Sequence, residues 1–152
     1  MNWKRKILVF ILFLSPGLAF STEKLKSIVP LKVVSVERAR VNDRLVRTIL
    51  YDTDKSAQLD IELIKTPEMT TLIDRRVVKK IDIIVSGKRE VLNFADSAAT
   101  SIDNIRIDNG FVKFDVEFFV RVRGGHYLSA CTVDVNKDVL PEPMCRLVKQ
   151  GL

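Results

Sequence analysis

The chain has 152 residues, with 25 Lys and Arg against 19 Asp and Glu, a formal net charge of +6, two cysteines and one histidine. A chain of this length is expected to form one domain, because domains most often hold roughly 100 to 150 residues, and this excludes an enzyme with separate cofactor and substrate lobes. The phosphate-binding glycine motifs, the H-E-x-x-H zinc motif and the G-x-S-x-G nucleophile motif are all absent from the sequence, so neither a catalytic activity nor a cofactor is predicted.

Residues 1–21 have the pattern of an export signal. A basic triplet at 4–6 precedes an apolar stretch at 7–14, and cleavage is expected after Ala19 or Ser21. The apolar stretch is much shorter than the roughly 20 residues of a membrane-spanning helix, and no cysteine follows it for lipid attachment. Removal of the signal leaves 131 residues with a net charge of +3, which is too small to predict nucleic-acid binding. We therefore expect a periplasmic or secreted protein that is not an integral membrane protein.

The first part of the mature chain is predicted to be a strand meander. A polar lead-in at 22–29 precedes the folded domain, which is expected to span residues 30–152. Apolar and polar residues then alternate, which predicts strands at 31–37, 44–51 and 58–64. Asn and Asp residues between these segments supply the turns.

The middle of the chain breaks this alternation. Thr66 and Pro67 resemble the start of a helix, and apolar residues follow at helical spacing, so a helix is predicted from Pro67 to about Arg76. The β-branched residues of 77–85 predict a strand after it. Small residues at 95–103 give that segment a weakly helical character, and a loop is the alternative.

The last third shows two hairpin signals, Asn109-Gly110 and Gly124-Gly125. They predict a three-stranded antiparallel meander with strands at 104–108, 111–123 and 126–136. If both turns contain two residues, Ile107 lies opposite Val112, and the apolar residues of the three strands share one face. The fold predicted for the whole chain is a mainly β single domain, with α+β as the alternative. It is an antiparallel β-sandwich or partly open barrel of about seven strands with one short helix.

In the same register, Phe118 lies opposite Cys131 and Val116 opposite Val133. Cys131 then faces the core, and in an oxidising compartment it is expected to form a disulfide with Cys145 that staples the C-terminal tail. Two cysteines and one histidine are too few to predict a Cys/His metal site.

Two candidate partner surfaces follow from these patterns. On the polar face of the C-terminal meander, Phe119 and Leu128 form an apolar patch beside Arg121 and Arg123, and this patch is either exposed or covered by a second layer. The second surface is a basic segment, which consists of Arg75, Arg76, Lys79 and Lys80. On a helix these side chains would form one cationic arc that suits an anionic surface, whereas on a strand they would separate. A solvated face balanced by neighbouring acidic residues is the alternative.

The expected function is that of an exported, non-enzymatic binding module, with a protein partner in the cell envelope and no nucleic-acid partner. An accessory role in pilus biogenesis or secretion is the specific expectation. The alternatives are an inhibitor or immunity-type protein, or a small carboxylate- or metal-dependent hydrolase. The hydrolase would use Asp115, Asp134 and His126, since the predicted register places Asp115 opposite Asp134.

Overall fold

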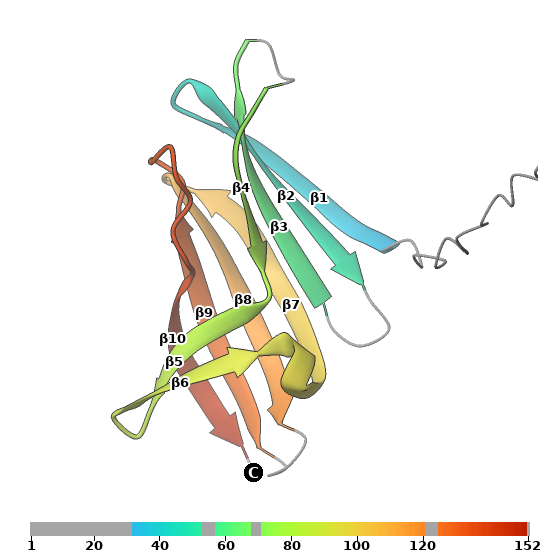
Figure 1. The fold of residues 1–152 in the computed structure, drawn as a ribbon, viewed down its shortest axis with the longest axis vertical. Helices are drawn as coiled ribbons and strands as arrows, with labels where there is room; N and C mark the ends of the chain where they lie inside the picture. The colour runs from blue at the N-terminus through green and yellow to red at the C-terminus, as the bar shows by residue number, and fades with distance from the viewer. Residues whose placement is uncertain (1–31, 53–56, 68–70, 121–124, 152) are drawn as a thin grey trace, which may run out of the picture.

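The computed structural model describes residues 32–52, 57–67, 71–120 and 125–151, which form ten β-strands and one short 3₁₀ turn (Figure 1). In chain order these elements are β1 (Lys32–Val41), β2 (Arg44–Asp52), β3 (Ala57–Lys65), β4 (Leu72–Val78), β5 (Lys80–Val85), β6 (Lys88–Asn93), η1 (Phe94–Asp96), β7 (Ser97–Asp108), β8 (Phe111–Val120), β9 (His126–Asp134) and β10 (Met144–Gly151). The signal expected at 1–21 and the lead-in at 22–29 lie outside the described residues. Within the described ranges, no helix has the length and apolar character of a membrane span.

The strands form two sheets. The first has the order β1-β2-β3-β4, and the second has the order β6-β5-β10-β9-β8-β7. β10 runs parallel to β5, where Met144 pairs with Asp82, and the other neighbouring strands are antiparallel. The chain passes from the first sheet to the second between β4 and β5, which only Lys79 separates (Figure 1). The predicted mainly β sandwich is therefore confirmed, although with more strands than the seven expected.

The core lies between the inner faces of the two sheets. Because side chains alternate along a strand, Leu59 and Ile61 of β3 and Phe114 and Val116 of β8 belong to the same buried core, and all four are at most 1% exposed. Burial of each such side chain stabilises the fold by about 2 kcal/mol relative to an exposed position. The alternation predicted for these strands thus places the expected residues inside.

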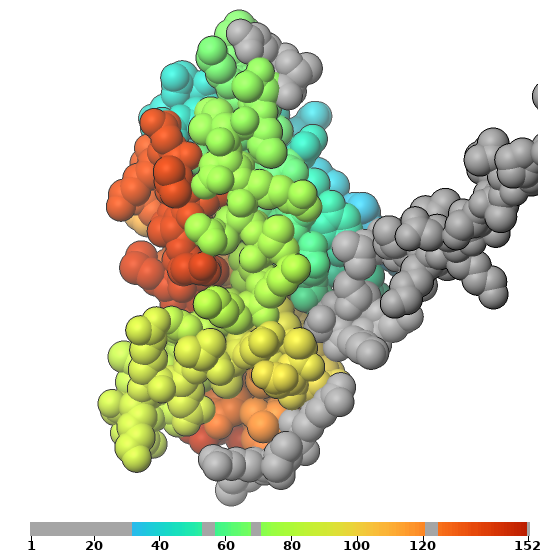
Figure 2. Space-filling view, in the orientation of Figure 1, coloured from blue at the N-terminus to red at the C-terminus, as the bar shows by residue number. Residues whose placement is uncertain are grey.

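The connection between β9 and β10 packs against β4. Leu140 is fully buried, its N–H donates to Asp74 Oδ2 at 2.7 Å, and its carbonyl accepts from Arg76 Nη2 at 2.6 Å. Arg76 also forms an ion pair with Glu142 at 3.1 Å. In the space-filling view β4 (green) crosses the centre of the visible face next to the red C-terminal strand (Figure 2).

The helix predicted from Pro67 to Arg76 is wrong, because Leu72–Val78 is strand β4. The helical spacing of apolar residues does not mark a buried face, since Leu72 is 49% exposed and Ile73 is 37% exposed. β4 forms because it pairs with β3, where Arg75 lies opposite Glu62. This long-range pairing overrides the local helix-start signal at Thr66 and Pro67.

The segment 95–103, predicted as weakly helical or a loop, is mostly strand. Only Phe94–Asp96 forms a 3₁₀ turn, in which Asn93 Oδ1 accepts the N–H of Ala95 at 3.1 Å, and β7 begins at Ser97. Small side chains suit this strand because Thr100 and Ser97 are buried and their hydroxyls hydrogen bond to each other at 2.7 Å.

The hairpin between β7 and β8 forms as predicted. Asn109 and Gly110 have φ values of 50° and 76°, as a type I′ turn requires, and Ile107 pairs with Val112.

The register predicted for β8 and β9 is wrong, because Val112 pairs with Val133 and Phe118 pairs with Tyr127. β8 ends at Val120 and β9 begins at His126, so the connection is longer than the assumed two-residue turn. The shift is an even number of residues, so every side chain keeps its predicted face.

The disulfide between Cys131 and Cys145 is confirmed. The two cysteines lie directly opposite each other on β9 and β10. The chain after β9 therefore returns as a neighbouring strand of the same sheet, and the bond fixes the position of that strand.

A turn at the end of β9 holds a carboxylate in its ionised form. Asp134 Oδ1 accepts from both the backbone N–H and the side-chain Nδ2 of Asn136, each at 3.0 Å. These hydrogen bonds, with the more distant Lys137 ammonium, lower the pKa of Asp134 from its ordinary value of 3.8.

We expect Asp134→Asn to reduce the acid sensitivity of the fold. A lowered pKa in the folded state contributes stability above pH 3.8 that disappears as the pH falls through the folded pKa. Chemical unfolding measured between about pH 5 and about pH 2 should therefore show a smaller loss of stability in the variant than in the wild type. Asp96→Asn, which changes an exposed carboxylate with no ion pair to any described residue, is the control. Equal acid sensitivity of the wild type and Asp134→Asn would contradict the expectation.

Candidate functional site

The outer face of the second sheet carries the apolar patch predicted from the sequence. Phe119 of β8 is 39% exposed and stacks on the His126 ring of β9, with ring centroids 4.5 Å apart and an interplanar angle of 13°. Leu128 is half-buried and lies opposite Glu117. The patch faces away from the core, because the first sheet packs against the opposite face of β8, which carries Val116. Phe119 lies opposite His126, whereas the register predicted from a two-residue turn would have placed it opposite Ala130.

β10 extends this outer face. Lys149 lies opposite Leu128, and Arg146 lies opposite Ala130. Met144 and Val148 on the same strand are 64% and 54% exposed. We name the group of Phe119, His126, Leu128, Arg146 and Lys149 the outer sheet patch. Sequence reasoning missed the contribution of β10, because Met144 to Lys149 read Met-Cys-Arg-Leu-Val-Lys and lack the strict apolar and polar alternation of a half-buried strand.

Acidic side chains lie on the other flank of the outer sheet patch. His126 Nε2 and Glu117 Oε1 are 2.7 Å apart, and Ser101 Oγ donates to Asp103 Oδ2 at 3.0 Å and to Glu117 Oε2 at 3.4 Å. Beside the outer sheet patch, the face is therefore acidic around Asp103 and Glu117 and basic on β10, with Phe119 and Leu128 between them. A surface with an apolar centre flanked by charge suits contact with another protein.

The same contacts do not form a nucleophilic catalytic site. A serine nucleophile needs a hydroxyl at one imidazole nitrogen and an orienting carboxylate at the other. Here Glu117 bonds His126 Nε2, Ser101 donates to carboxylates, and the Nδ1 atom lies beside the backbone of Gly151. Ser129 is fully buried on the opposite face of β9.

The facing pair of Asp115 and Asp134 predicted for a hydrolase is not formed. Asp115 lies opposite Ala130 on β9 and accepts a hydrogen bond from Asn104 Nδ2 at 2.8 Å, whereas Asp134 lies opposite Phe111. The cause is again the longer connection between β8 and β9. Within the described ranges, no group of three or more His, Cys, Asp or Glu residues is arranged to hold a metal ion.

The basic segment is split by the strand geometry. Arg75 points to the outer side of the first sheet and bonds Asp60, whereas Arg76 points to the inner side and bonds the carbonyl of Leu140. Lys79 and Lys80 are exposed at the crossing between the sheets. The four side chains therefore do not form one cationic arc. Two further predicted site residues, Arg121 and Arg123, lie outside the described residues.

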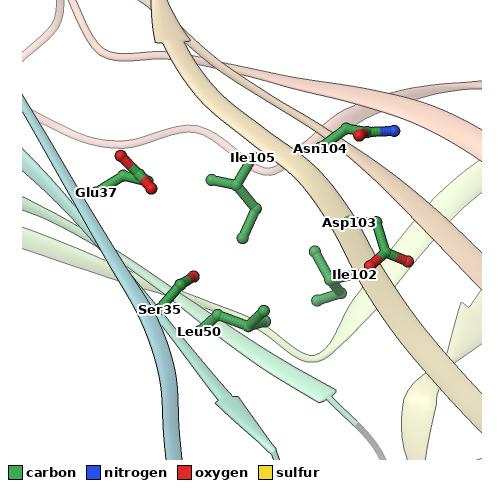
Figure 3. Close-up of a pocket in the computed structure, with 7 residues that line it drawn as sticks. All are labelled: Ser35, Glu37, Leu50, Ile102, Asp103, Asn104 and Ile105. Atoms are coloured by element: carbon green, nitrogen blue, oxygen red, sulfur yellow. The ribbon is translucent and has the colours of Figure 1, made fainter.

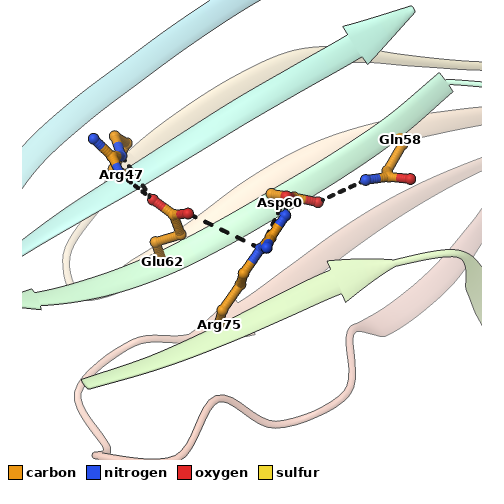
Figure 4. A network of polar contacts seen from close by, with 5 residues as sticks. All are labelled: Arg47, Gln58, Asp60, Glu62 and Arg75. Atoms are coloured by element: carbon orange, nitrogen blue, oxygen red, sulfur yellow. Dashed lines mark hydrogen bonds and ion pairs between the residues drawn. The ribbon is translucent and has the colours of Figure 1, made fainter. Parts of the chain in front are cut away.

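Arg75 belongs to a charged network on the outer side of β3 (Figure 4). Arg75 Nε donates to Asp60 Oδ2 at 3.0 Å, Gln58 Nε2 donates to Asp60 Oδ1 at 3.0 Å, and Arg47 Nε donates to Glu62 Oε2 at 2.7 Å. The Asp60 side chain is 0% exposed and that of Glu62 is 10% exposed. The hydrogen bond to Asp60 raises the pKa of the Arg75 guanidinium, and the charges of Asp60 and Glu62 add to this effect against the opposing effect of burial.

A cavity of about 290 Å³ opens between the two sheets beside β1 (Figure 3). Leu50 of β2 and Ile102 and Ile105 of β7 supply its apolar side chains. Its polar residues come from β1 and β7, and they are Ser35, Glu37, Asp103 and Asn104. No pattern in the sequence predicts this cavity, because the cavity depends on which strands of the two sheets face each other.

Comparison of the chain with protein-family models, with curated proteins and with solved structures finds no match.

Proposed function

We propose that this chain is an exported, non-enzymatic binding protein of the cell envelope, acting as an accessory of an assembly such as a pilus or a secretion system. The observation that carries the proposal is the exposure of Phe119, which is stacked on His126 on the outer face of the second sheet, next to the connection between β8 and β9. An aromatic side chain held rigidly at a surface is typical of the anchors of protein interfaces. The disulfide supports an oxidising compartment, where such bonds persist.

The outer sheet patch is where the partner is proposed to bind. Its acidic and basic flanks favour a partner with the opposite arrangement of charge, because such complementarity speeds encounter and excludes wrong partners. An inhibitor or immunity-type protein would use the same chemistry and differ only in the identity of the partner.

Site-specific photocrosslinking in the native cells tests this proposal. A photoreactive amino acid in place of Leu128 should yield a defined crosslinked product with an envelope protein, and the product should disappear when Phe119→Ser is added. The control position is Ile84, which is 67% exposed on β5 and lies outside the patch. Crosslinks that form equally from both positions, or none from Leu128 in the folded and exported protein, would contradict the proposal.

A further inference from the structure

The edges of the two sheets differ in how their open sides are occupied. β4 is flanked by the segment that contains Leu140 and Glu142, which Arg76 holds in place. β6 has only six residues, and its first three are charged. β7 contains a register break between Asp103 and Arg106. Short, charged and bulged edges are the usual protections against pairing with another strand.

β1 is longer than β4 and β6 and more regular than β7: it has ten residues, its register break lies near its start, between Val33 and Ser35, and its charged residues are spread along the strand. From Ser35 to Val41 it pairs with β2 without interruption, and within the described ranges no strand pairs with its other side. Val33, Val34 and Val36 are each at least 50% exposed. The open side therefore presents unpaired N–H and C=O groups of alternate residues along a regular strand.

The two faces beside this edge carry opposite charges. Arg38 and Arg40 lie on the outer face, and neither forms an ion pair or side-chain hydrogen bond with any other described residue. On the inner face, Ser35 and Glu37 border the cavity between the sheets, whose apolar residues include Ile102 and Ile105 (Figure 3).

We propose that β1 accepts an extended strand from a partner protein, with acidic side chains on its outer face and apolar side chains that enter the cavity. Backbone hydrogen bonds to an exposed sheet edge supply affinity in this mode of recognition, and pockets for alternate side chains supply specificity. The acidic residues would pair with Arg38 and Arg40, and an apolar side chain would pack against Leu50 and Ile105, which are only partly buried. This site lies on the first sheet and does not depend on the outer sheet patch.

A second copy of this chain is a poorer occupant. Two β1 strands paired about a two-fold axis could offer only one acidic residue each, Glu37, to the basic residues of the other copy. Such pairing places residues of the same face opposite each other, so Glu37, which lies on the inner face, cannot meet Arg38 or Arg40 on the outer face. Charge complementarity therefore favours a different, acidic strand.

The test is a titration with a synthetic peptide of ten residues, the length of β1, in which Glu and Val alternate. Backbone amide resonances of Ser35–Val41 should shift, and these amides should gain protection from hydrogen exchange. The peptide should bind about five- to tenfold more tightly than a Lys–Val peptide, because its glutamates attract Arg38 and Arg40, whereas lysines at the same positions would repel these two exposed residues. A peptide with the same composition but with all valines first should bind more weakly, because only alternation satisfies both faces.

Charge reversal on β1 tests whether its edge is the site that binds the peptide. Arg38→Glu with Arg40→Glu should reverse the preference, so that the Lys–Val peptide becomes the tighter ligand. The control, Arg146→Glu with Lys149→Glu in the outer sheet patch, should leave the preference unchanged. The proposal would be overturned if the peptide shifts no resonance in β1, or shifts only resonances in β6 or β7. It would also be overturned if the charge reversal at Arg38 and Arg40 leaves the peptide preference unchanged, or if sedimentation shows that the chain self-associates through β1. Crosslinking from Leu128 reports on the proposed function separately.

Discussion

Arg75→Met is expected to lower the free energy of unfolding by about 2 to 3 kcal/mol. The substitution removes the cation that pairs with Asp60, whose side chain is completely buried on the outer side of β3. Loss of one partner of a fully buried pair costs about 3 to 5 kcal/mol, because the remaining charge is left without compensation. Arg75 is itself 46% exposed, so solvent already weakens this pair and the lower range applies.

The effect of Arg75→Met should persist from neutral to alkaline pH. Since the pKa of Arg75 is raised in the folded state, its contribution to stability is fully present below the unfolded pKa. It would be lost only as the pH rises through the folded pKa, beyond the range of ordinary measurements. The loss of stability in Arg75→Met can be measured by chemical unfolding, followed by far-ultraviolet circular dichroism, at one neutral and one alkaline pH.

Arg89→Met is the matched control for Arg75→Met. Arg89 also pairs with a single aspartate, Asp82, on an antiparallel strand pair, but its side chain is 74% exposed. We expect a change too small to distinguish from experimental error, because exposed ion pairs contribute little. If the two variants lose the same stability, burial of Asp60 is not the source of the effect. The double variant Asp60→Leu with Arg75→Met should recover most of the loss, since no unpaired charge remains.

The local sequence pattern was sufficient to predict those features of the fold that depend on residues close together in the chain. Asn109-Gly110 predicted its hairpin because a type I′ turn needs two residues with positive φ. The alternation along β8 and β9 placed Val116 and Cys131 on the core face, and a shift in register left this placement intact. The face of a strand is a local property, and it can therefore be predicted from sequence.

The errors arose where pairing between distant residues decides the outcome. β4 forms through pairs such as Arg75 with Glu62, which outweigh the helix-start signal before it. The partner of Asp115 depends on the length of the connection between Val120 and His126, which two glycines suggested was shorter. A hydrolase hypothesis that depends on facing carboxylates is sensitive to such an error, whereas a surface patch that depends on the face alone is not.

The open edge of β1 could not be predicted from the sequence, although the strand itself could. The sequence predicts a strand at 31–37, and the structure extends it to Val41. Whether a strand is central or at an edge depends on the order of strands in the sheet, which no local pattern encodes. The same holds for β10, which the sequence indicated only as a stapled tail and which the structure places between β9 and β5.

Removal of the disulfide is expected to lower the free energy of unfolding by about 3 kcal/mol. The bond between Cys131 and Cys145 closes a short loop, and its loss increases the conformational freedom of the unfolded chain. The double variant Cys131→Ala with Cys145→Ala and the wild type in reductant should lose similar amounts in chemical unfolding. The reduced wild type keeps both side chains, so it separates the effect of the cross-link from the effect of lost packing at Cys131, which is only 1% exposed.

The loss of order on reduction should be local as well as global. β10 is joined to β9 by an antiparallel ladder of several pairs, but to β5 by the single pair of Met144 with Asp82. Cys145 is adjacent to Met144, so the disulfide fixes β10 at the point where β5 and β6 attach to the rest of the sheet. Hydrogen exchange after reduction should therefore rise more in β5 and β6 than in β7 and β8. A uniform rise across all six strands would instead mean that the disulfide stabilises only the sheet as a whole.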